Sequence, residues 1–246
     1  MIRLQTDGFT NCVETMHSYS IFTMSSEPRH PDQPRRSFRR TTALVRRQEL
    51  IRATLDCIAE SGMHAATVRE IAERVGVSNG LIRHHFATKE QMIQEAYRVT
   101  MAEMTALSRA AGDSALGLPR ERLRRYVAAN LGPPVCDAKR LTLWASFIAM
   151  IHLNPPMAEI HREAYLEFRK DIELLLAEAF AAEGSEISAE ECRLMAIKIN
   201  AVIDGLWLEG SLDPDLFAPG ELLSIGLEAV EEILGLPLEE ATKQRA

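Results

Sequence analysis

The 246-residue chain has few cysteines and few aromatic residues, and it has no long hydrophobic run. The four cysteines, Cys12, Cys57, Cys136 and Cys192, are too scattered for a metal site or for the disulfide framework of a secreted domain. No apolar stretch reaches the roughly 18–20 residues that cross a membrane, and none near the N-terminus has signal-peptide length. We therefore expect a cytoplasmic protein with reduced thiols that does not contact a membrane.

The sequence also lacks the motifs of most enzyme classes. It contains no glycine-rich phosphate loop, no internal repeat and no strand-like alternation of apolar and polar residues. A helical enzyme is one hypothesis, but we find no nucleophile with a matching base and no metal-ligand spacing. We therefore predict that the protein is not an enzyme and needs no cofactor.

The net charge of −7 conceals an asymmetry along the chain. Residues 1–100 carry 14 Lys or Arg against 11 Asp or Glu, a net charge of +3, whereas residues 101–246 carry 14 against 24, a net charge of −10. A basic front on an acidic body is typical of a chain that presents only its N-terminal part to a polyanion.

Residues 1–41 are expected to form a disordered basic tail, because serine, proline and arginine are mixed there with isolated apolar residues that show no period. Two interpretations of this tail stay open: a solvated charged segment, and an arm that contacts DNA phosphates. Translation from Met24 is an alternative start that the sequence alone does not decide.

Helical patterning begins at Thr42, with apolar residues three and four positions apart as far as a stop at Gly62. Thr67 and Glu70 have the spacing of a capping box for a short second helix, which Gly76 ends.

A third helix is expected from the N-cap Ser78 to about Phe86, and Thr88 with Gln91 has the spacing of a second capping box, which opens a longer helix. Two very short helices joined by a glycine-containing turn are typical of a helix-turn-helix unit.

Beyond residue 118 the pattern stays helical, and clusters of Gly, Pro and Asp separate the segments. The expected helices are 119–131, 137–153, 156–183, 188–212 and 218–235. The predicted fold class is all-α: an N-terminal helix-turn-helix domain of three helices at residues 42–90 and a larger C-terminal helical bundle at residues 91–246.

The short helix led by Ser78 suits DNA for physical reasons. Its free N–H groups and the Ser78 hydroxyl can bond a phosphate, and a helix fits the major groove, which is about 12 Å wide. Gly80 permits a close approach of the backbone, and Lys89 adds a second phosphate contact. The polar residues expected to face outward are Asn79, Arg83 and His84. The residues expected to supply the inner contacts are Leu81, Ile82, His85 and Phe86.

The adjacent histidines, His84 and His85, raise the question of a metal or catalytic site. Neighbouring positions on a helix point about 100° apart, so the two rings are badly placed to hold one ion. A zinc pair on a helix has i, i+4 spacing, which is absent here. We therefore expect His84 to face DNA and His85 to face inward.

The stretch "ATVREIAERVGVSNGLIRHHFATKEQMI" resembles the DNA-binding domain of TetR-family transcriptional repressors, and the match covers about residues 44–97. The resemblance implies that Phe86 anchors the core. It also implies that six residues lie at or near DNA: Thr67, Ser78, Asn79, Gly80, His84 and Lys89. Two departures from the family pattern are Arg83 and His85, which stand where relatives commonly have tyrosine. Arg83 retains the capacity to contact DNA and could read a guanine. Because it replaces the tyrosine of relatives, the operator sequence of those relatives does not carry over.

The second half resembles BetI-type members of that family through "INAVIDGLWLEGSLDP" and "LTLWASFIAMIHLNPPM". Those relatives repress genes that make betaine from choline. The resemblance therefore implies a small-molecule inducer that is choline-like, although the shared run is found more broadly than the choline response.

The last two helices are candidates for a dimer interface, since helix-turn-helix proteins pair to place two reading helices in successive major grooves. Their apolar residues form one face of Met195, Ile199, Val202, Ile203, Leu206 and Trp207, and another of Leu222, Ile225, Leu227, Val230 and Ile233. We expect a four-helix interface between two subunits. Packing of these faces within one subunit is the alternative.

A ligand cavity is the other expected feature of the bundle. An aromatic cage with one carboxylate would bind a quaternary ammonium ion through cation–π contacts. The candidate residues are Trp144, Phe147, Tyr165, Phe168, Asp204 and Trp207. The alternative is that these aromatic residues form ordinary core and that Asp204 only hydrogen-bonds across the bundle.

These expectations describe a homodimeric repressor that binds a palindromic double-stranded DNA operator and is released from it by a small molecule. The alternative function is a small-molecule-binding helical dimer whose DNA-reading head is vestigial.

Overall fold

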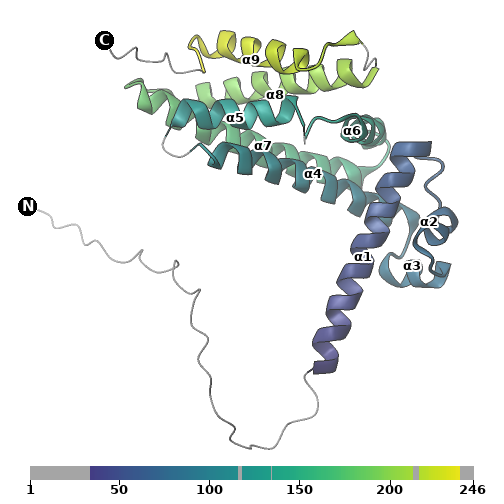
Figure 1. Ribbon diagram of the computed structural model, residues 1–246. Helices are drawn as coiled ribbons and strands as arrows, with labels where there is room; N and C mark the ends of the chain where they lie inside the picture. The colour runs from purple at the N-terminus through teal and green to yellow at the C-terminus, as the bar shows by residue number, and fades with distance from the viewer. Residues whose placement is uncertain (1–33, 116–117, 134, 213–215, 239–246) are drawn as a thin grey trace, which may run out of the picture. The chain divides into compact units, whose positions relative to one another are not determined.

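In a computed structural model, the backbone of residues 34–115, 118–133, 135–212 and 216–238 is described, with side chains from Ala43 onward. These residues form nine α-helices and no strand, which confirms the all-α class (Figure 1). The helices are α1 (Pro34–Ser61), α2 (Val68–Val75), α3 (Asn79–His85), α4 (Lys89–Asp113), α5 (Pro119–Leu131), α6 (Ala138–Ile151), α7 (Pro155–Ala182), α8 (Ala189–Leu212) and α9 (Glu221–Leu234).

Helix α1 begins at Pro34, before the position that the apolar period predicts. Residues 34–41, which we expected to belong to a disordered tail, are helical. The physical reason is local: proline is favoured at the first position of a helix, and the arginines that follow have high helix propensity. The rest of the expected tail, including Met24, lies outside the described residues. From Thr42 onward the described residues form one compact unit.

The three predicted N-caps are present at the starts of α2, α3 and α4. The side-chain oxygens of Thr67, Ser78 and Thr88 accept the backbone N–H groups of Glu70, Leu81 and Gln91. Neither capping box is reciprocal, because the Glu70 carboxylate pairs with Arg74 and the Gln91 side chain accepts the N–H of Ala87. The caps fix where each short helix starts, and with it the turn between α2 and α3.

The N-terminal core contains residues of α1, α2, α3 and α4 together with residues of α6 and α7. Ile82 and Phe86 are buried in it together with Tyr97 of α4 and Phe147 of α6. The C-terminal core is formed mainly by α4, α5, α7, α8 and α9 and contains Met104 of α4. Because α4 contributes to both cores, it connects the DNA-binding candidate to the body, and the boundary at residues 90 and 91 stays a prediction.

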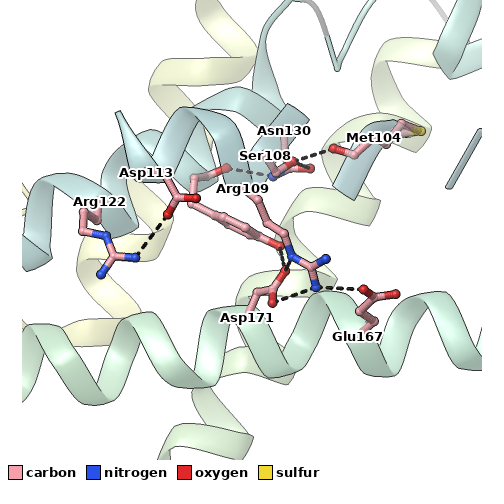
Figure 2. A network of polar contacts seen from close by, with 9 residues as sticks. Met104, Ser108, Arg109, Asp113, Arg122, Asn130, Glu167 and Asp171 are labelled. Carbon is pink, nitrogen blue, oxygen red and sulfur yellow. Dashed lines mark hydrogen bonds and ion pairs between the residues drawn. The ribbon is translucent and has the colours of Figure 1, made fainter. Parts of the chain in front are cut away.

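A polar network fixes the C-terminal part of α4 to α5 and α7 (Figure 2). Ser108 donates to the side-chain oxygen of Asn130 at 3.0 Å, and Arg109 binds Asp171 through two hydrogen bonds of 2.7 and 3.0 Å. The Tyr126 hydroxyl donates to the same Asp171 carboxylate at 3.1 Å. Such linked hydrogen bonds hold the three helices in one arrangement.

The apolar faces predicted for the dimer interface are partly internal. Ile199, Ile203, Trp207 and Val230 are buried in the subunit's own core, as the alternative interpretation requires. Some of the predicted residues are internal because α8 is apolar on more than one side, and the location of the interface stays a prediction. A different stripe on α8 is exposed, formed by Leu194, Ala201, Gly205, Leu208 and Leu212.

Close packing of α9 on α5 and α8 depends on Gly226. A Cβ at this position would lie 2.2 Å from Cδ1 of Leu131 and 3.0 Å from Cδ1 of Leu206. We expect Gly226→Ala to lower the free energy of unfolding by about 1–3 kcal/mol through overpacking, an effect that outweighs alanine's better helix propensity. Urea denaturation measures the change. Ser224→Ala, at an exposed position of the same helix, serves as the control, and a Gly226→Ala protein more stable than the wild type would contradict the prediction.

Within the described part of the chain, no helix is both long enough and apolar enough to cross a membrane.

Candidate functional site

The first candidate site is the outer surface of α3 with the adjoining helix starts. Asn79, Gly80, Arg83 and His84 of α3 are exposed. Thr67 and Ser78, the caps of α2 and α3, are also exposed, and Lys89 at the start of α4 is half-buried. The seven residues predicted to contact DNA therefore lie on α3 or at the starts of α2, α3 and α4.

The opposite side of α3 fixes it to the core. Ile82 and Phe86 are buried, and Leu81 and His85 are half-buried. The guanidinium of Arg47 lies 4.9 Å from the centre of the Phe86 ring and pairs with Glu95 at 3.1 Å. Burial, together with the charges of His84 and Arg47, lowers the pKa of His85. His85 therefore favours its neutral form, while Arg83 and His84 face solvent.

Ser78 has hydrogen-bonding capacity left for a phosphate. Its side-chain oxygen accepts the Leu81 N–H at 3.3 Å, so its own hydroxyl hydrogen remains available to donate. Outside its chain neighbours and its own helix backbone, a Cβ at Gly80 would meet among the described residues just Oγ of Ser78, at 3.7 Å, so the α3 backbone is open to an approaching partner there.

The paired histidines are not part of a metal site in the structure. Among the described residues, no group of three or more His, Cys, Asp and Glu side chains has metal-binding geometry. His84 and His85 contact each other edge to face, with ring centres 5.5 Å apart.

The second candidate site is a partly open cavity between α4, α5, α7 and α8. Its lining residues are Met101, Met104, Thr105, Asn130, Tyr165, Phe168, Asn200, Ile203, Asp204 and Trp207. Its free volume of about 20 Å³ has room for one water molecule rather than for a quaternary ammonium ion. A ligand therefore enters only if the wall moves, and Met101 and Met104 supply flexible side chains on that wall.

Asp204 is the carboxylate of the cavity, and two neighbours hold it in place. Tyr165 donates its hydroxyl to Oδ1 at 2.8 Å, and the side-chain amide of Asn200 donates to Oδ2 at 2.6 Å. Burial raises the pKa of Asp204 to about 6, although these two donors and the charge of Arg169 act in the opposite direction. Near neutral pH the cavity therefore contains a desolvated negative charge, which attracts a cation.

Four of the six predicted cage residues line this cavity: Tyr165, Phe168, Asp204 and Trp207. Trp144 is adjacent to it, because its indole N–H lies 3.4 Å from the Tyr165 hydroxyl and its ring meets Trp207 edge to face at 5.6 Å. Phe147 does not line it. The Phe147 ring packs against Tyr97 at 4.8 Å in the N-terminal core, because it lies on α6 nearly one turn beyond Trp144.

Several lining residues were missed by the sequence analysis, among them Asn130 and Asn200. Both are buried amides in helices, and burying an unpaired polar group is costly. A buried asparagine therefore marks a specific polar contact, but the sequence alone does not show that these two asparagines are buried. The backbone carbonyl oxygen of Asn130 accepts the Trp207 indole N–H at 2.5 Å, which positions the Trp207 ring at the cavity.

A further polar contact connects the cavity to the N-terminal core. The Tyr97 hydroxyl of α4 lies 2.7 Å from Nδ1 of His161 on α7. The His161 ring contacts the Tyr165 ring, with centres 3.9 Å apart. Burial and the charge of Arg169 lower the pKa of His161, so the neutral ring is able to accept the Tyr97 hydroxyl hydrogen.

Comparison with protein families gives two matches that cover most of the chain. Residues 50–96 match the family described as bacterial regulatory proteins of the tetR family. Residues 119–235 match the family described as BetI-type transcriptional repressor, C-terminal. The first match contains α2 and α3, and the second contains α8 with Asp204 and Trp207.

Similar whole proteins are transcriptional regulators. The HTH-type transcriptional regulator BetI of Pectobacterium atrosepticum is 32% identical over 192 residues, which cover 77% of this chain and 94% of that protein. The BetI regulator of Pseudomonas aeruginosa PAO1 is 30% identical over 194 residues, with coverage of 77% and 93%.

Solved structures have the same arrangement of helices. A transcriptional regulator from Pseudomonas aeruginosa PAO1 superposes with a TM-score of 0.69 at 31% identity, covering 78% of this chain and 91% of that one. A regulator from Saccharomonospora viridis, solved in complex with choline, gives a TM-score of 0.65 at 21% identity, with coverage of 78% and 96%. At that identity the second comparison shows the fold alone.

Proposed function

Because this chain belongs to the TetR family of transcriptional regulators, we propose that it is a homodimeric repressor released from its operator by a small cationic ligand. Members of this family bind DNA operators, act as dimers and are not enzymes. The observation that carries the proposal is the buried, ionisable Asp204 among aromatic residues, in a body that shares α4 with the DNA-binding head.

The exposed surface of α3 is our candidate for direct contact with bases. Arg83 and His84 project from a helix whose other side is fixed by Ile82 and Phe86, so their positions are set before DNA binds. Arginine reads guanine in the major groove through two hydrogen bonds. Thr67, Ser78 and Lys89 lie at helix starts, where backbone N–H groups and a positive charge favour phosphate contacts.

The exposed stripe of α8 is our candidate for the dimer interface. Leu208 is 47% exposed and Leu212 is 71% exposed in the isolated subunit. Gly205 lies three residues before Leu208 on the same stripe, and outside its own helix backbone no described atom lies within 4 Å of where a Cβ would be, so a partner helix has room to approach. Pairing of two such stripes removes apolar surface from water.

Leu208→Glu should convert the dimer to monomers, because it places a charge in the proposed apolar interface. Sedimentation or light scattering measures the mass at micromolar concentration. The matched control is Leu166→Glu, which puts the same charge on an exposed leucine of α7 and should leave the mass unchanged. A Leu208→Glu protein that stays dimeric would move the interface away from this stripe.

The proposed ligand class is a small quaternary ammonium ion of the choline type. Tyr165, Phe168 and Trp207 present ring surfaces around the Asp204 carboxylate, and such rings attract a desolvated cation. The small free volume means that binding requires an opened cavity. A ligand that binds the opened state better than the closed one shifts the population towards it.

The test is binding of the full chain to DNA from upstream of its own gene, followed by fluorescence anisotropy, with and without choline. We expect nanomolar affinity for one palindromic site, a steep loss of affinity with salt, and release by choline. Equal and weak binding to every DNA fragment would refute sequence-specific repression. Tight binding that choline leaves unchanged would refute the ligand class alone.

A further inference from the structure

We propose that Tyr97 and His161 form the bridge through which the state of the Asp204 cavity reaches the DNA-binding helices. The inference rests on the proposed function, because it assigns the regulation of that same cavity to two residues that do not line it. His161 is thus a positioning residue that acts through its neighbours.

The bridge is a continuous series of side-chain contacts across three helices. Asp204 of α8 accepts the Tyr165 hydroxyl of α7 at 2.8 Å. The Tyr165 ring meets the His161 ring, also on α7, at 3.9 Å between centres. His161 then bonds the Tyr97 hydroxyl of α4 at 2.7 Å. Each contact is close enough that moving one side chain displaces the next.

The Tyr97 end of the bridge lies within the N-terminal core. Tyr97 is fully buried, its ring packs against Phe147, and it belongs to the same core cluster as Ile82 and Phe86 of the α3 region. Protein cores are close-packed, so a displaced tyrosine there shifts its neighbours rather than filling empty space. A change at Tyr97 therefore reaches the helix that is our candidate for reading DNA.

The Tyr165 end of the bridge has to move when a ligand enters. The free volume of about 20 Å³ beside Asp204 is too small for a quaternary ammonium ion. The Tyr165 hydroxyl occupies one oxygen of the Asp204 carboxylate, and an entering cation competes for that carboxylate. Displacing Tyr165 removes the surface on which His161 rests.

The charged and titratable groups around His161 keep the bridge neutral. Arg169 of α7 lowers the pKa of His161, as burial does, and burial raises the pKa values of Tyr97 and Tyr165. The carboxylate of Asp204 also raises the pKa values of both tyrosines. Near neutral pH the two tyrosines therefore retain their hydroxyl hydrogens and the His161 ring is neutral, so the contact between Tyr97 and His161 is a hydrogen bond between uncharged groups.

The first experiment separates ligand binding from ligand response. His161→Phe keeps a ring beside Tyr165 but removes the ring nitrogen that hydrogen-bonds Tyr97, and Tyr97→Phe removes the hydroxyl. Both variants should bind operator and choline within about threefold of wild type, yet choline should weaken their operator binding less than about twofold. Wild type should show the coupling factor of about 5–150 that is typical of allosteric proteins.

Choline binding is measured separately by intrinsic fluorescence, because the only two tryptophans of the chain, Trp144 and Trp207, both adjoin or line the cavity. His152→Phe, at the exposed C-terminal end of α6, is the matched control and should respond as wild type does. A His161→Phe protein that binds choline and is released from DNA normally would overturn the bridge.

A second experiment tests the bridge without any ligand, so that its failure is distinct from failure of the proposed ligand class. The effects of Tyr97→Phe and of Asp204→Ala, which removes the acceptor of the Tyr165 hydroxyl, on operator affinity should deviate from independence by about twofold or more, as expected for groups in one network. In a His161→Phe background the deviation should disappear. Independent effects in the wild-type background would overturn the proposal whether or not choline binds.

Discussion

Arg83→Ala should reduce operator affinity by about thirtyfold or more while leaving the fold intact. Each lost arginine–guanine contact costs about 1–3 kcal/mol, and a dimer loses two of them. Arg83 is exposed and has no role in the core, so the melting temperature should stay within the small range expected of surface substitutions. Anisotropy titrations with operator DNA and thermal unfolding measure the two effects.

Two comparisons make this result specific to the α3 surface. Arg193→Ala removes an exposed arginine from α8, where Arg193 pairs with Glu190, and should leave DNA affinity unchanged. Replacing one guanine at a time in the operator should identify the position whose substitution costs the wild type but not Arg83→Ala. Unchanged affinity in both Arg83→Ala and His84→Ala would favour a vestigial head.

Asp204→Asn should weaken choline binding by about thirtyfold or more, because removing one member of a buried charge pair costs about 2 kcal/mol or more. The asparagine retains an oxygen for Tyr165 and nearly the same volume, so the change removes the charge and the hydrogen bond that Oδ2 accepts from Asn200. Glu209→Gln, at an exposed position of the same helix, is the control. Titrations followed by tryptophan fluorescence measure the affinity.

A neutral analogue of choline gives the sharper form of this test. In 3,3-dimethyl-1-butanol a carbon replaces the charged nitrogen, so its shape is nearly the same. Wild type should prefer choline, and Asp204→Asn should bind the two compounds alike. An undiminished preference for choline in Asp204→Asn would show that the aromatic rings, and not the carboxylate, select the charge.

The same carboxylate predicts how ligand affinity depends on pH. Burial raises the pKa of Asp204 to about 6, so the carboxyl is mostly neutral at pH 5 and ionised at pH 7.5. A cation binds the ionised form, and choline affinity should therefore rise about tenfold from pH 5 to pH 7.5 and then level off. His161 on α7 also faces this region, so the pH titration should be repeated with His161→Phe. In Asp204→Asn the rise should be absent.

Local sequence signals predicted most of the helix-turn-helix domain. The N-caps Thr67, Ser78 and Thr88 and the stop at Gly76 act within one helical turn, so their effects need no knowledge of the tertiary fold. The side chains of Glu70 and Gln91 do not bond back to the N-cap residues, for a tertiary reason in the first case and a local reason in the second. Arg74 of α2, which also binds Glu60 of α1, takes the Glu70 carboxylate, and Gln91 reaches one residue further back.

The cavity was predictable only in part, because it depends on which side of each helix faces its neighbours. Tyr165, Asp204 and Trp207 combine aromatic or charged character with helical spacing, and the structure places them together. Phe147 has the same character but lies on the side of α6 that faces Tyr97. Likewise, α8 is apolar around much of its circumference, so period alone did not separate its internal side from its exposed stripe.

The polar network of Ser108, Arg109, Asn130 and Asp171 clamps α4 to α5 and α7, so any rotation of α4 would pivot at this point (Figure 2). At 1.5 Å per residue, Tyr97 lies about 16 Å and Lys89 about 28 Å along the helix from Ser108. If α4 turns as a rigid rod about that clamp, a shift of about 1 Å at Tyr97 becomes about 1.7 Å at Lys89, beside the end of α3. In a dimer, the α4 helices of the two subunits would move in opposite directions and change the separation of the reading helices by about twice as much. In the proposed function each reading helix enters its own major groove, about 34–36 Å from the other, so such a change of separation would take the two helices out of step with the DNA.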